Sequence, residues 1–559
     1  MPVDSLKNSC PAWVGHLVFL LILAVVTGVA YSNSLFSPFV FDDLVNIVDK
    51  STMQMTALTW KSMQRAAAEG VCAKRWLPNL SFGLNYYFHG YEVFGYHLVN
   101  LAVHLLTAYL FYGFSFTTLT LPQIGFKPRV AVELSLVAAL LWAVHPLQTN
   151  AVTYLVQRMT SMAAFFYLAA LLCYVRGRLV FLANRLLPEK QNHFAPAAII
   201  FPFFPLRSYL WWTGSLLCGL AAMLSKENSA MLVLIIPAYE FYFLREQTVK
   251  PDYKKIIPAL LITFTVLFVV GWLYLGTNPF TAITHGFGGR DFTMLERLLT
   301  ESRIIFHYLS LILLPLPSRL NLAYDYQISH SLLVPPQTLL ALLGIIGLLV
   351  LTAYLFKRHK LLSFGLFWFL ANLAIESTII PLELIFEHRL YLPSTMLILA
   401  LVVGLAQIFR ERQVMRRLFL AVLIVLLGLG TWQRNKAWAS EISLWSDVVK
   451  KSPNLSRGYD YLGRAYNIAE RYQDAFDVYQ DAARRGIDEV GIYNNWGKAA
   501  FNLGKIDRAV DLLEHAVQLE PRHSESHYNL GVAYGTLGRQ DEARREMALG
   551  MKLNELKQR

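Results

Sequence analysis

The strongest constraint on this chain is a series of long apolar segments separated by short polar and basic ones. Many of these segments approach or exceed the roughly 20 residues that a helix needs to cross a bilayer core of about 30 Å. The chain is 55% hydrophobic and only 16% charged, whereas about a quarter of the residues in a soluble domain carry charge. We therefore expect an integral membrane protein.

Counting apolar runs predicts eleven membrane spans. Residues 304–316 are also apolar, but this run is only about 13 residues long, so we expect a re-entrant or interfacial helix there. The predicted spans are 13–31, 97–120, 130–144, 150–175, 208–224, 228–244, 256–276, 333–356, 361–380, 390–409 and 416–433.

Loop charge predicts the orientation of these spans. Lys and Arg gather in alternate loops, for example at Lys127, Arg129, Lys357 and Arg358, and such loops are typically cytoplasmic. The N-terminus is then cytoplasmic and both the first loop, 32–96, and the C-terminus lie outside, as in a bacterial inner membrane or its equivalent. The first run could also be a signal peptide, but its length favours a retained helix. Because the net charge of +12 resides in these loops, nucleic acid is not an expected partner.

The composition after Trp432 changes to a water-soluble helical pattern with a period of 34 residues. This is the period of tetratricopeptide (TPR) repeats, in which small residues let paired helices pack closely. We predict an all-α chain with a membrane domain at 1–433 and a TPR domain at 434–559. The latter divides into a partial repeat, 434–455, and repeats 456–489, 490–523 and 524–557. The recurring residues are Gly463, Gly497 and Gly531, and Ala475, Ala509 and Ala543.

Two adjacent acids, Asp42 and Asp43, follow the first apolar segment and an aromatic-rich approach. Neighbouring carboxylates split their pKa values, so one can act as a base while the other positions a proton or an acceptor. The competing interpretation is helix capping, because Asp is common at helix N-termini. We predict that this pair forms the catalytic centre.

Further polar side chains fall on the predicted outer side. His97, with Asn100 and His104, lies on one face of a span, where a histidine is more often a helix-to-helix hydrogen-bonding partner. Arg158 is expected about 12 Å down a helix, so we expect it to have an anionic partner, either a carboxylate or a lipid phosphate. The remaining outer candidates are Arg75, His145, Lys226, Glu227, Glu387, His388 and Arg389.

Cationic helix ends beside acids on one face are what a phosphorylated lipid and a proton transfer would need. We expect Arg389, Arg158, Lys226 and His388 to bind the donor phosphate. Arg75, His97, His145, Glu227 and Glu387 are expected to support them. The four scattered cysteines, Cys10, Cys72, Cys173 and Cys218, predict neither a disulfide framework nor a metal cluster.

The chain also carries a resemblance to a known family. The segments FVFDDLVNI, RWLPNLSFGLNYYFHGYEVFGYHLVNLAVH, HPLQTNAVTYLVQR, LSKENSAMLVLIIPAYE and EHRLYLPS, followed by 34-residue repeats, resemble the transmembrane and tetratricopeptide-repeat protein O-mannosyltransferases and their prokaryotic relatives. That family is placed in the GT-C glycosyltransferase superfamily. Two departures are Asn150, where many relatives have an acid, and Arg75, which is separated from Pro78 where an adjacent Arg-Pro is usual.

The resemblance implies an inverting transfer of mannose or a similar hexose from a polyprenyl-phosphate donor to Ser or Thr hydroxyls of exported proteins. Asp42 or Asp43 would be the base, the TPR groove would present the acceptor, and membrane lipids would surround the site. Some GT-C members use a divalent metal and others do not, so the resemblance leaves a metal open. The alternatives are a glycolipid-modifying transferase, and a non-catalytic scaffold or transporter of lipid-linked sugar.

Overall fold

In the computed structural model, the described part of the chain comprises residues 12–558, except 71–72, 187–203, 246–257 and scattered positions between 259 and 277. Within this part the chain contains helices and loops but no strand. It divides into two compact units, one formed by 1–320 and 327–435 and the other by 321–326 and 436–559. The second unit thus includes a short segment that the predicted domain boundary assigned to the first.

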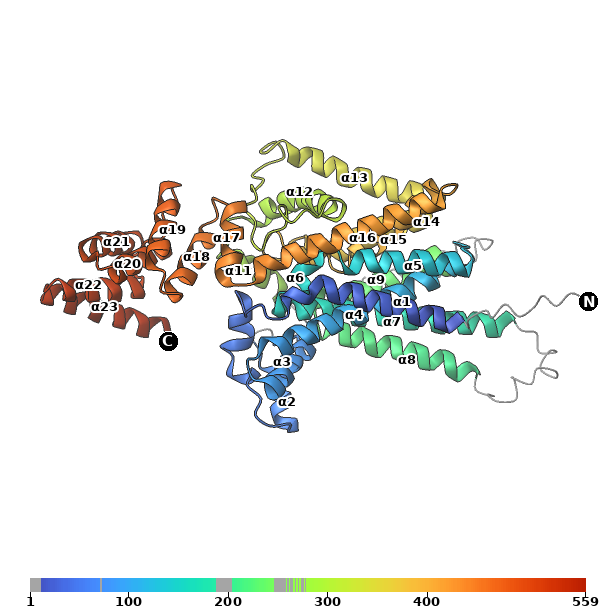
Figure 1. Cartoon of the computed structure of the whole chain (residues 1–559), viewed down its shortest axis with the longest axis horizontal. Coiled ribbons are helices and arrows are strands. Elements are labelled where there is room, and N and C mark those ends of the chain that lie inside the picture. The colour runs from blue at the N-terminus through green and yellow to red at the C-terminus, as the bar shows by residue number, and fades with distance from the viewer. Residues whose placement is uncertain are drawn as a thin grey trace, which may run out of the picture. The chain divides into compact units, whose positions relative to one another are not determined.

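The first unit is a bundle of long apolar helices together with shorter ones. Helix α4 packs against α1, α5 and α7, and α15 packs against α5 and α14, as the neighbouring ribbons in Figure 1 show. Its helices are α1 (Ala12–Tyr31), α2 (Trp60–Ala68), α3 (Trp76–His89), α4 (Val93–Thr120), α5 (Pro128–Ala143), α6 (Thr149–Val152), α7 (Arg158–Leu186), α8 (Phe204–Met223), α9 (Leu232–Tyr239), α11 (Pro279–Gly286), α12 (Met294–Leu313), α13 (Gln337–Leu355), α14 (Lys360–Leu373), α15 (Ser394–Ile408) and α16 (Gln413–Asn435).

Among the described residues, five helices are long and apolar enough to cross a membrane, or six if the bent pair 128–143 and 146–152 forms one span. The predicted count of eleven is therefore not confirmed. Helices α14 and α15 are apolar but shorter, and the predicted span 228–244 breaks into a 3-10 turn, α9 and a π-helix. The predicted span 256–276 lies mostly outside the described residues.

Two helix boundaries differ from those predicted. Residues 150–175 do not form one helix, because the chain turns between α6 and α7 and the long helix begins at Arg158. Arg158 therefore lies at the start of α7, and the predicted depth of about 12 Å was wrong. Most of the short apolar run at 304–316, up to Leu313, belongs to the longer α12. This helix also carries Glu296, Arg297, Glu301 and Arg303 and is not among the candidate spans.

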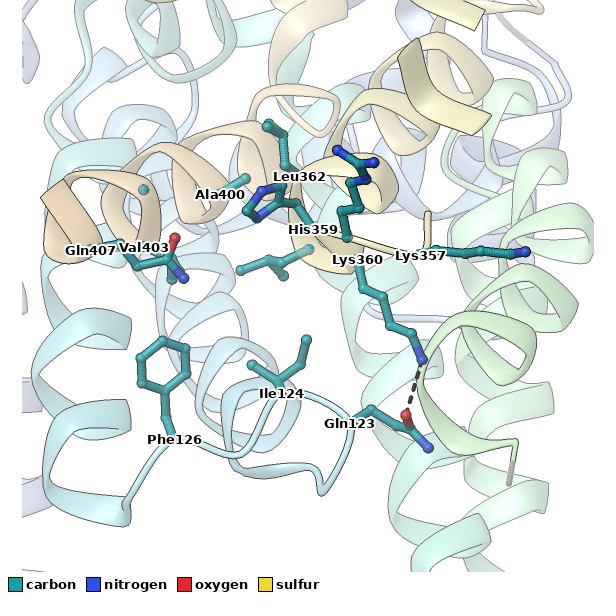
Figure 2. A pocket seen from close by; sticks show the side chains of 13 residues that line it. Gln123, Ile124, Phe126, Lys357, His359, Lys360, Leu362, Ala400, Val403 and Gln407 are labelled. Atoms are coloured by element: carbon teal, nitrogen blue, oxygen red, sulfur yellow. Dashed lines mark hydrogen bonds between the residues drawn. The ribbon is translucent and has the colours of Figure 1, made fainter. Parts of the chain in front are cut away.

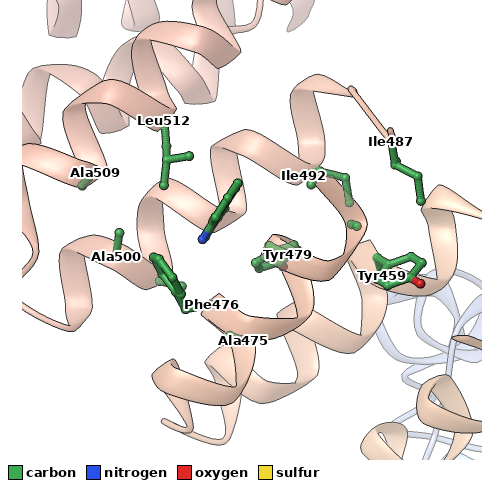
Figure 3. Packing of buried hydrophobic residues seen from close by; sticks show 12 residues of the cluster. Tyr459, Ala475, Phe476, Tyr479, Ile487, Ile492, Ala500, Ala509 and Leu512 are labelled. Atoms are coloured by element: carbon green, nitrogen blue, oxygen red, sulfur yellow. The ribbon is translucent and has the colours of Figure 1, made fainter. Parts of the chain in front are cut away.

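The second unit consists of paired helices that follow the 34-residue period. After α17 (Glu441–Lys451), the pairs are α18 (Ser456–Ile468) with α19 (Tyr472–Arg484), α20 (Val490–Asn502) with α21 (Ile506–Leu519), and α22 (Ser524–Thr536) with α23 (Gln540–Gln558). The core between successive pairs contains Phe476, Tyr479 and Ile492 (Figure 3). The predicted alanines Ala475 and Ala509 belong to this core, and Ala543 belongs to the core of the last repeats.

The repeated glycines allow the two helices of each pair to approach closely. A Cβ at Gly497 would lie 2.6 Å from Leu513 Cγ, and one at Gly531 would lie 2.5 Å from Met547 Cγ. Gly463 meets Tyr479 in the same way, so each glycine contacts the residue sixteen positions later. Because a side chain at these sites would collide with the partner helix, the period in the sequence reflects a packing requirement.

Residues 321–326 join the second unit through Ser452. The Ser452 hydroxyl donates to the carbonyl of Ala323 at 3.0 Å, and it accepts from Asn321 Nδ2 and from the Asp325 backbone N–H, both at 3.0 Å. Asn454 Nδ2 also donates to Asp325 Oδ2 at 2.8 Å. This segment follows α12 by eight residues, so a loop of the helical bundle is part of the same compact unit as the repeats.

Candidate active site

The two adjacent acids occupy different environments. Asp43 is fully buried, and its carboxylate accepts the backbone N–H groups of Val40 at 3.1 Å and Val156 at 2.7 Å. Asp42 is only partly buried, and its backbone N–H donates to the Tyr154 hydroxyl at 3.0 Å. Asp43 precedes a short π-helix but makes no side-chain capping bond to it, so the capping interpretation is wrong for Asp43.

The backbone directly before the pair is strained. Phe41 has a φ of 51°, a left-handed conformation that costs energy for a bulky side chain and that often occurs at functional sites. Nearby, the ring of Phe39 packs edge-on against Tyr91 and Tyr96. The aromatic approach predicted from the sequence thus braces a turn that presents Asp42.

Burial raises the pKa of Asp43 to about 8, and the neighbouring charge of Asp42 adds to this effect, while the backbone N–H bonds from Val40 and Val156 lower it. A neutral Asp43 leaves the partly exposed Asp42 as the member of the pair that can accept a proton. This division of roles agrees with the expected splitting of two neighbouring carboxyl groups.

Arg158 is fully buried in a cage of neutral oxygens. Its guanidinium donates to Asn100 Oδ1 and Asn85 Oδ1, both at 2.6 Å, to the Tyr96 carbonyl at 3.0 Å and to Ser81 Oγ at 3.2 Å. Among the described residues it forms no ion pair with a carboxylate, so the carboxylate, one of the two expected anionic partners, was wrong; the lipid phosphate stays a prediction. Amide and carbonyl dipoles solvate the charge instead, because Arg158 lies at a helix start where several loops converge.

Two ion pairs flank this cage. Arg75 holds Glu227 through two bonds, of 2.7 Å and 3.1 Å. Although burial raises the pKa of Glu227, the charge and hydrogen bonds of Arg75 outweigh burial and lower that pKa to about 2. Lys226 pairs with Glu376 at 2.7 Å, and both side chains are only 5% exposed. Asn228 Nδ2 donates to the same carboxylate at 3.2 Å.

Residues 156–160 connect these groups. The Val156 N–H binds Asp43, Arg158 occupies the neutral cage, Met159 Sδ lies 3.1 Å from Arg75 Nη1, and Thr160 Oγ1 accepts from Lys226 Nζ at 3.2 Å. Five consecutive residues around a helix start span only about 6 Å along the axis. The acidic pair and the cation cluster of Arg75 and Lys226, which come from different loops, are therefore anchored on one short segment.

Arg389 is buried and lies 3.9 Å from Glu301. It donates to the carbonyls of Leu384 at 2.8 Å and Glu383 at 2.6 Å. Glu301 also pairs with Arg297 at 2.8 Å. Burial raises the pKa of Glu301 to about 7 in spite of both arginines.

His388 and Glu387 complete this region. The His388 ring stacks on Phe386, and its Nδ1 lies 2.9 Å from Asn150 Oδ1. Burial and the charges of Lys226, Arg389 and Arg75 hold the pKa of His388 well below its usual range, so the ring is a neutral hydrogen-bonding group. Glu387 is buried beside it. A cavity of about 10 Å³, with room for roughly one water molecule, is lined by Thr160, Asn228, His388 and Arg389 among others.

The other predicted histidines join segments that are distant in the sequence. His97 Nε2 lies 2.8 Å from the Ser37 carbonyl, and His145 Nε2 lies 3.0 Å from the Ile312 carbonyl. His104 bridges the Tyr391 hydroxyl at 2.7 Å and the Ala143 carbonyl at 2.9 Å. The helix-to-helix role is confirmed for His104, which joins α4 to the end of α5, whereas His97 joins α4 to a loop carbonyl. His145 holds the turn before α6 against α12.

Sequence reasoning missed two buried acids, Glu376 and Glu301. Glu376 lies near the end of the predicted span 361–380. A lone acid among apolar residues there indicates a partner for a cation. Glu301 lay just before a run judged too short to span, so it attracted no attention. No group of three or more His, Cys, Asp or Glu side chains that could hold a metal ion occurs among the described residues.

Comparison with known proteins agrees with the resemblance. The family model for the tetratricopeptide repeat matches residues 494–550. The chain is 26% identical over 95% of its length to Drosophila melanogaster protein O-mannosyl-transferase Tmtc3, covering 63% of that protein. It is 25% identical over 94% of its length to Homo sapiens protein O-mannosyl-transferase TMTC3 and 26% identical over 87% to TMTC1, covering 59% and 56% of them.

The chain thus spans about three fifths of the length of these relatives. Their similarity extends through both the helical bundle and the repeats, because it covers most of this chain. The resemblance expected from the motifs is confirmed: over nearly its whole length this chain is similar to proteins named protein O-mannosyl-transferases, and its C-terminal part contains tetratricopeptide repeats.

Proposed function

We propose that this protein is a membrane glycosyltransferase of the GT-C type. It transfers mannose or a similar hexose from a polyprenyl-phosphate donor to Ser or Thr hydroxyls of exported proteins. The observation that carries the proposal is the anchoring of the acidic pair and the cation cluster on residues 156–160. The similarity to named protein O-mannosyl-transferases supports the same chemistry.

The site lies on the extracytoplasmic face in this proposal, with the N-terminus in the cytoplasm and the repeats outside. Residues 321–326 and the repeats form one compact unit, and segments in contact must share a compartment. The basic loops at Lys127 and Lys357 lie at the ends of α4 and α13–α14 that are remote from Asp43, which favours the cytoplasm for them.

Asp42 acts as the general base and Asp43 as its buried positioning neighbour. The Asp42 carboxylate takes the proton of the acceptor hydroxyl, and the oxygen attacks the anomeric carbon. The bond between that carbon and the phosphate oxygen breaks, so the lipid phosphate leaves with its electron pair and the configuration inverts. A phosphate is already a good leaving group, and stabilising its charge matters more than protonating it.

Lys226 and Arg389 supply positive charge for the departing phosphate, and neutral His388 supplies a hydrogen bond. These residues surround the small polar cavity or bond to the residues that line it. Donor binding has to widen that cavity, since about 10 Å³ holds little more than a water molecule. The Arg158 guanidinium donates hydrogen bonds to Asn100, Ser81, Asn85 and Tyr96. We therefore assign Arg158, with Arg75 and Glu227, a positioning role.

The TPR unit presents the acceptor protein, because stacked helix pairs form a concave surface that commonly binds polypeptide. Membrane lipids surround the bundle, whose helices α13 and α16 expose apolar side chains.

The decisive experiment measures sugar transfer from a polyprenyl-phosphate mannose donor to a Ser/Thr peptide by the purified full chain. Asp42→Asn should lower kcat by roughly 10²- to 10⁴-fold, as expected for loss of a general base. Asp49→Asn, which changes an exposed acid of the same loop, should retain full turnover. Undiminished turnover in both Asp42→Asn and Asp43→Asn would refute the assignment, and a non-catalytic scaffold would tolerate both changes.

A further inference from the structure

A second polar cavity lies at the opposite end of the helical bundle from Asp43. It has a volume of about 340 Å³ and lies between the α4–α5 loop, the α13–α14 turn and the second half of α15. Helix α4 begins near the Asp43 site and ends at this cavity, and its 28 residues cover about 40 Å. The cavity is therefore remote from the proposed catalytic chemistry.

The lining of this cavity is basic. Lys357, Arg358, His359 and Lys360 follow one another in the α13–α14 turn, and none of the thirteen lining residues is acidic. Lys360 Nζ donates to Gln123 Oε1 at 3.0 Å, as Figure 2 shows. Lys357 and Arg358 form no ion pair with any of the residues that the structure describes, and both are exposed.

Other features of the cavity complement an anion with an apolar attachment. Residues 360–362 begin α14 and line the cavity, and the first turn of a helix leaves backbone N–H groups without intrahelical acceptors. Opposite the basic turn, Ile124 and Phe126 form an apolar wall (Figure 2). At the rim, Leu362 is 37% exposed, and just beyond the lining residue Gln407, Ile408 is 77% exposed.

We propose that this cavity binds the phosphate-bearing headgroup of an anionic phospholipid, whose acyl chains lie along the apolar helices beside it. A volume of about 340 Å³ suits a headgroup, since small-ligand sites start at roughly 300 Å³. The exposed Leu362 in the lining, and Ile408 next to the lining residue Gln407, favour a lipid over a free phosphate. Basic sites between membrane helices on the cytoplasmic side commonly recognise such headgroups. Only the leaflet assignment rests on the proposed function.

The test uses the full chain, stripped of lipid in detergent and titrated with phosphatidylglycerol or phosphatidylcholine, with bound lipid counted by native mass spectrometry. Each basic side chain near an anionic headgroup contributes roughly fivefold in affinity. Lys357→Gln/Arg358→Gln, which changes only exposed side chains, should weaken phosphatidylglycerol binding about 30-fold, and adding Lys360→Gln should weaken it further. Arg410→Gln/Arg412→Gln, in the exposed α15–α16 loop, is the matched control and should bind normally.

The outcomes separate the candidate ligands. Unchanged phosphatidylglycerol binding in the Lys357/Arg358 variant overturns the proposal, as does an equal loss in the Arg410/Arg412 control, because the attraction would then be non-specific. Equal binding of phosphatidylcholine also overturns it. Complete displacement of phosphatidylglycerol by millimolar inorganic phosphate would identify a site for a small anion instead of a lipid headgroup. None of these readouts depends on sugar transfer, so failure of the proposed function would leave them interpretable.

Discussion

The buried pair of Lys226 and Glu376 allows a structural role to be separated from a role in donor binding. The two charges are 2.7 Å apart and each side chain is only 5% exposed. Removing one partner of such a pair leaves the other charge buried without a counter-charge, which lowers the free energy of unfolding by about 3–5 kcal/mol. A protein is stable by only about 5–15 kcal/mol, so the loss should be easy to measure.

The perturbation is Glu376→Gln, which removes the charge but retains an oxygen for Asn228, whose Nδ2 donates to Glu376 at 3.2 Å. We expect the free energy of unfolding, measured by denaturant titration in detergent, to fall by about 3–5 kcal/mol. Glu69→Gln is the control, because its pair with Arg65 is more than half exposed and should cost at most about 1 kcal/mol.

The double variant Lys226→Met/Glu376→Gln then removes both charges. It should recover most of the lost stability, because replacing both partners of a buried pair is often nearly neutral. Turnover with the polyprenyl-phosphate donor should stay low, since the charge that holds the phosphate is gone. Recovery of turnover together with stability would refute the role of Lys226 in donor binding, and a cost below about 1 kcal/mol in the single variant would refute the buried-pair reasoning.

Three further predictions concern other parts of the chain. Gly497→Ala should destabilise the repeats by about 1–3 kcal/mol, because the added Cβ would lie 2.6 Å from Leu513 Cγ. The loss should appear as faster hydrogen exchange in residues 490–519, and unchanged exchange would contradict the close packing. The folded pKa of Asp43, about 8, exceeds its unfolded value of about 4, so its contribution to stability is complete below pH 4 and is lost as the pH rises to 8. Asp43→Asn should therefore flatten the decline in melting temperature between pH 5 and 8. If the melting temperature of the variant fell with pH as steeply as that of the original chain, the raised pKa of Asp43 would be refuted. Ser452→Ala should speed hydrogen exchange at 321–326, since it removes three hydrogen bonds; equal protection would show that other contacts hold that segment.

The membrane character and the repeats could be predicted from local pattern. Apolar runs of about 20 residues have few alternatives to helices in a bilayer, and a 34-residue period with recurring glycines specifies paired helices. Gly497 alone predicts a close contact between the two helices of its pair, because such a contact requires a residue without a side chain. This requirement is local and does not depend on the rest of the fold. Span counting failed where helices break, as at residues 153–157, since hydropathy does not register a change of direction.

The acidic pair was prominent in the sequence because two adjacent carboxylates near a membrane are costly, yet the sequence could not say which one is buried. That depends on Val156, more than a hundred positions away, whose N–H binds Asp43. In the same way, Arg158 looked like a cation that needed an anion, and only tertiary contacts supplied its cage of neutral oxygens. The amino-acid sequence specifies which charged residues stand at each helix end. Their partners depend on tertiary packing, because a hydrogen bond depends on the positions of two atoms in space, which a linear pattern does not encode.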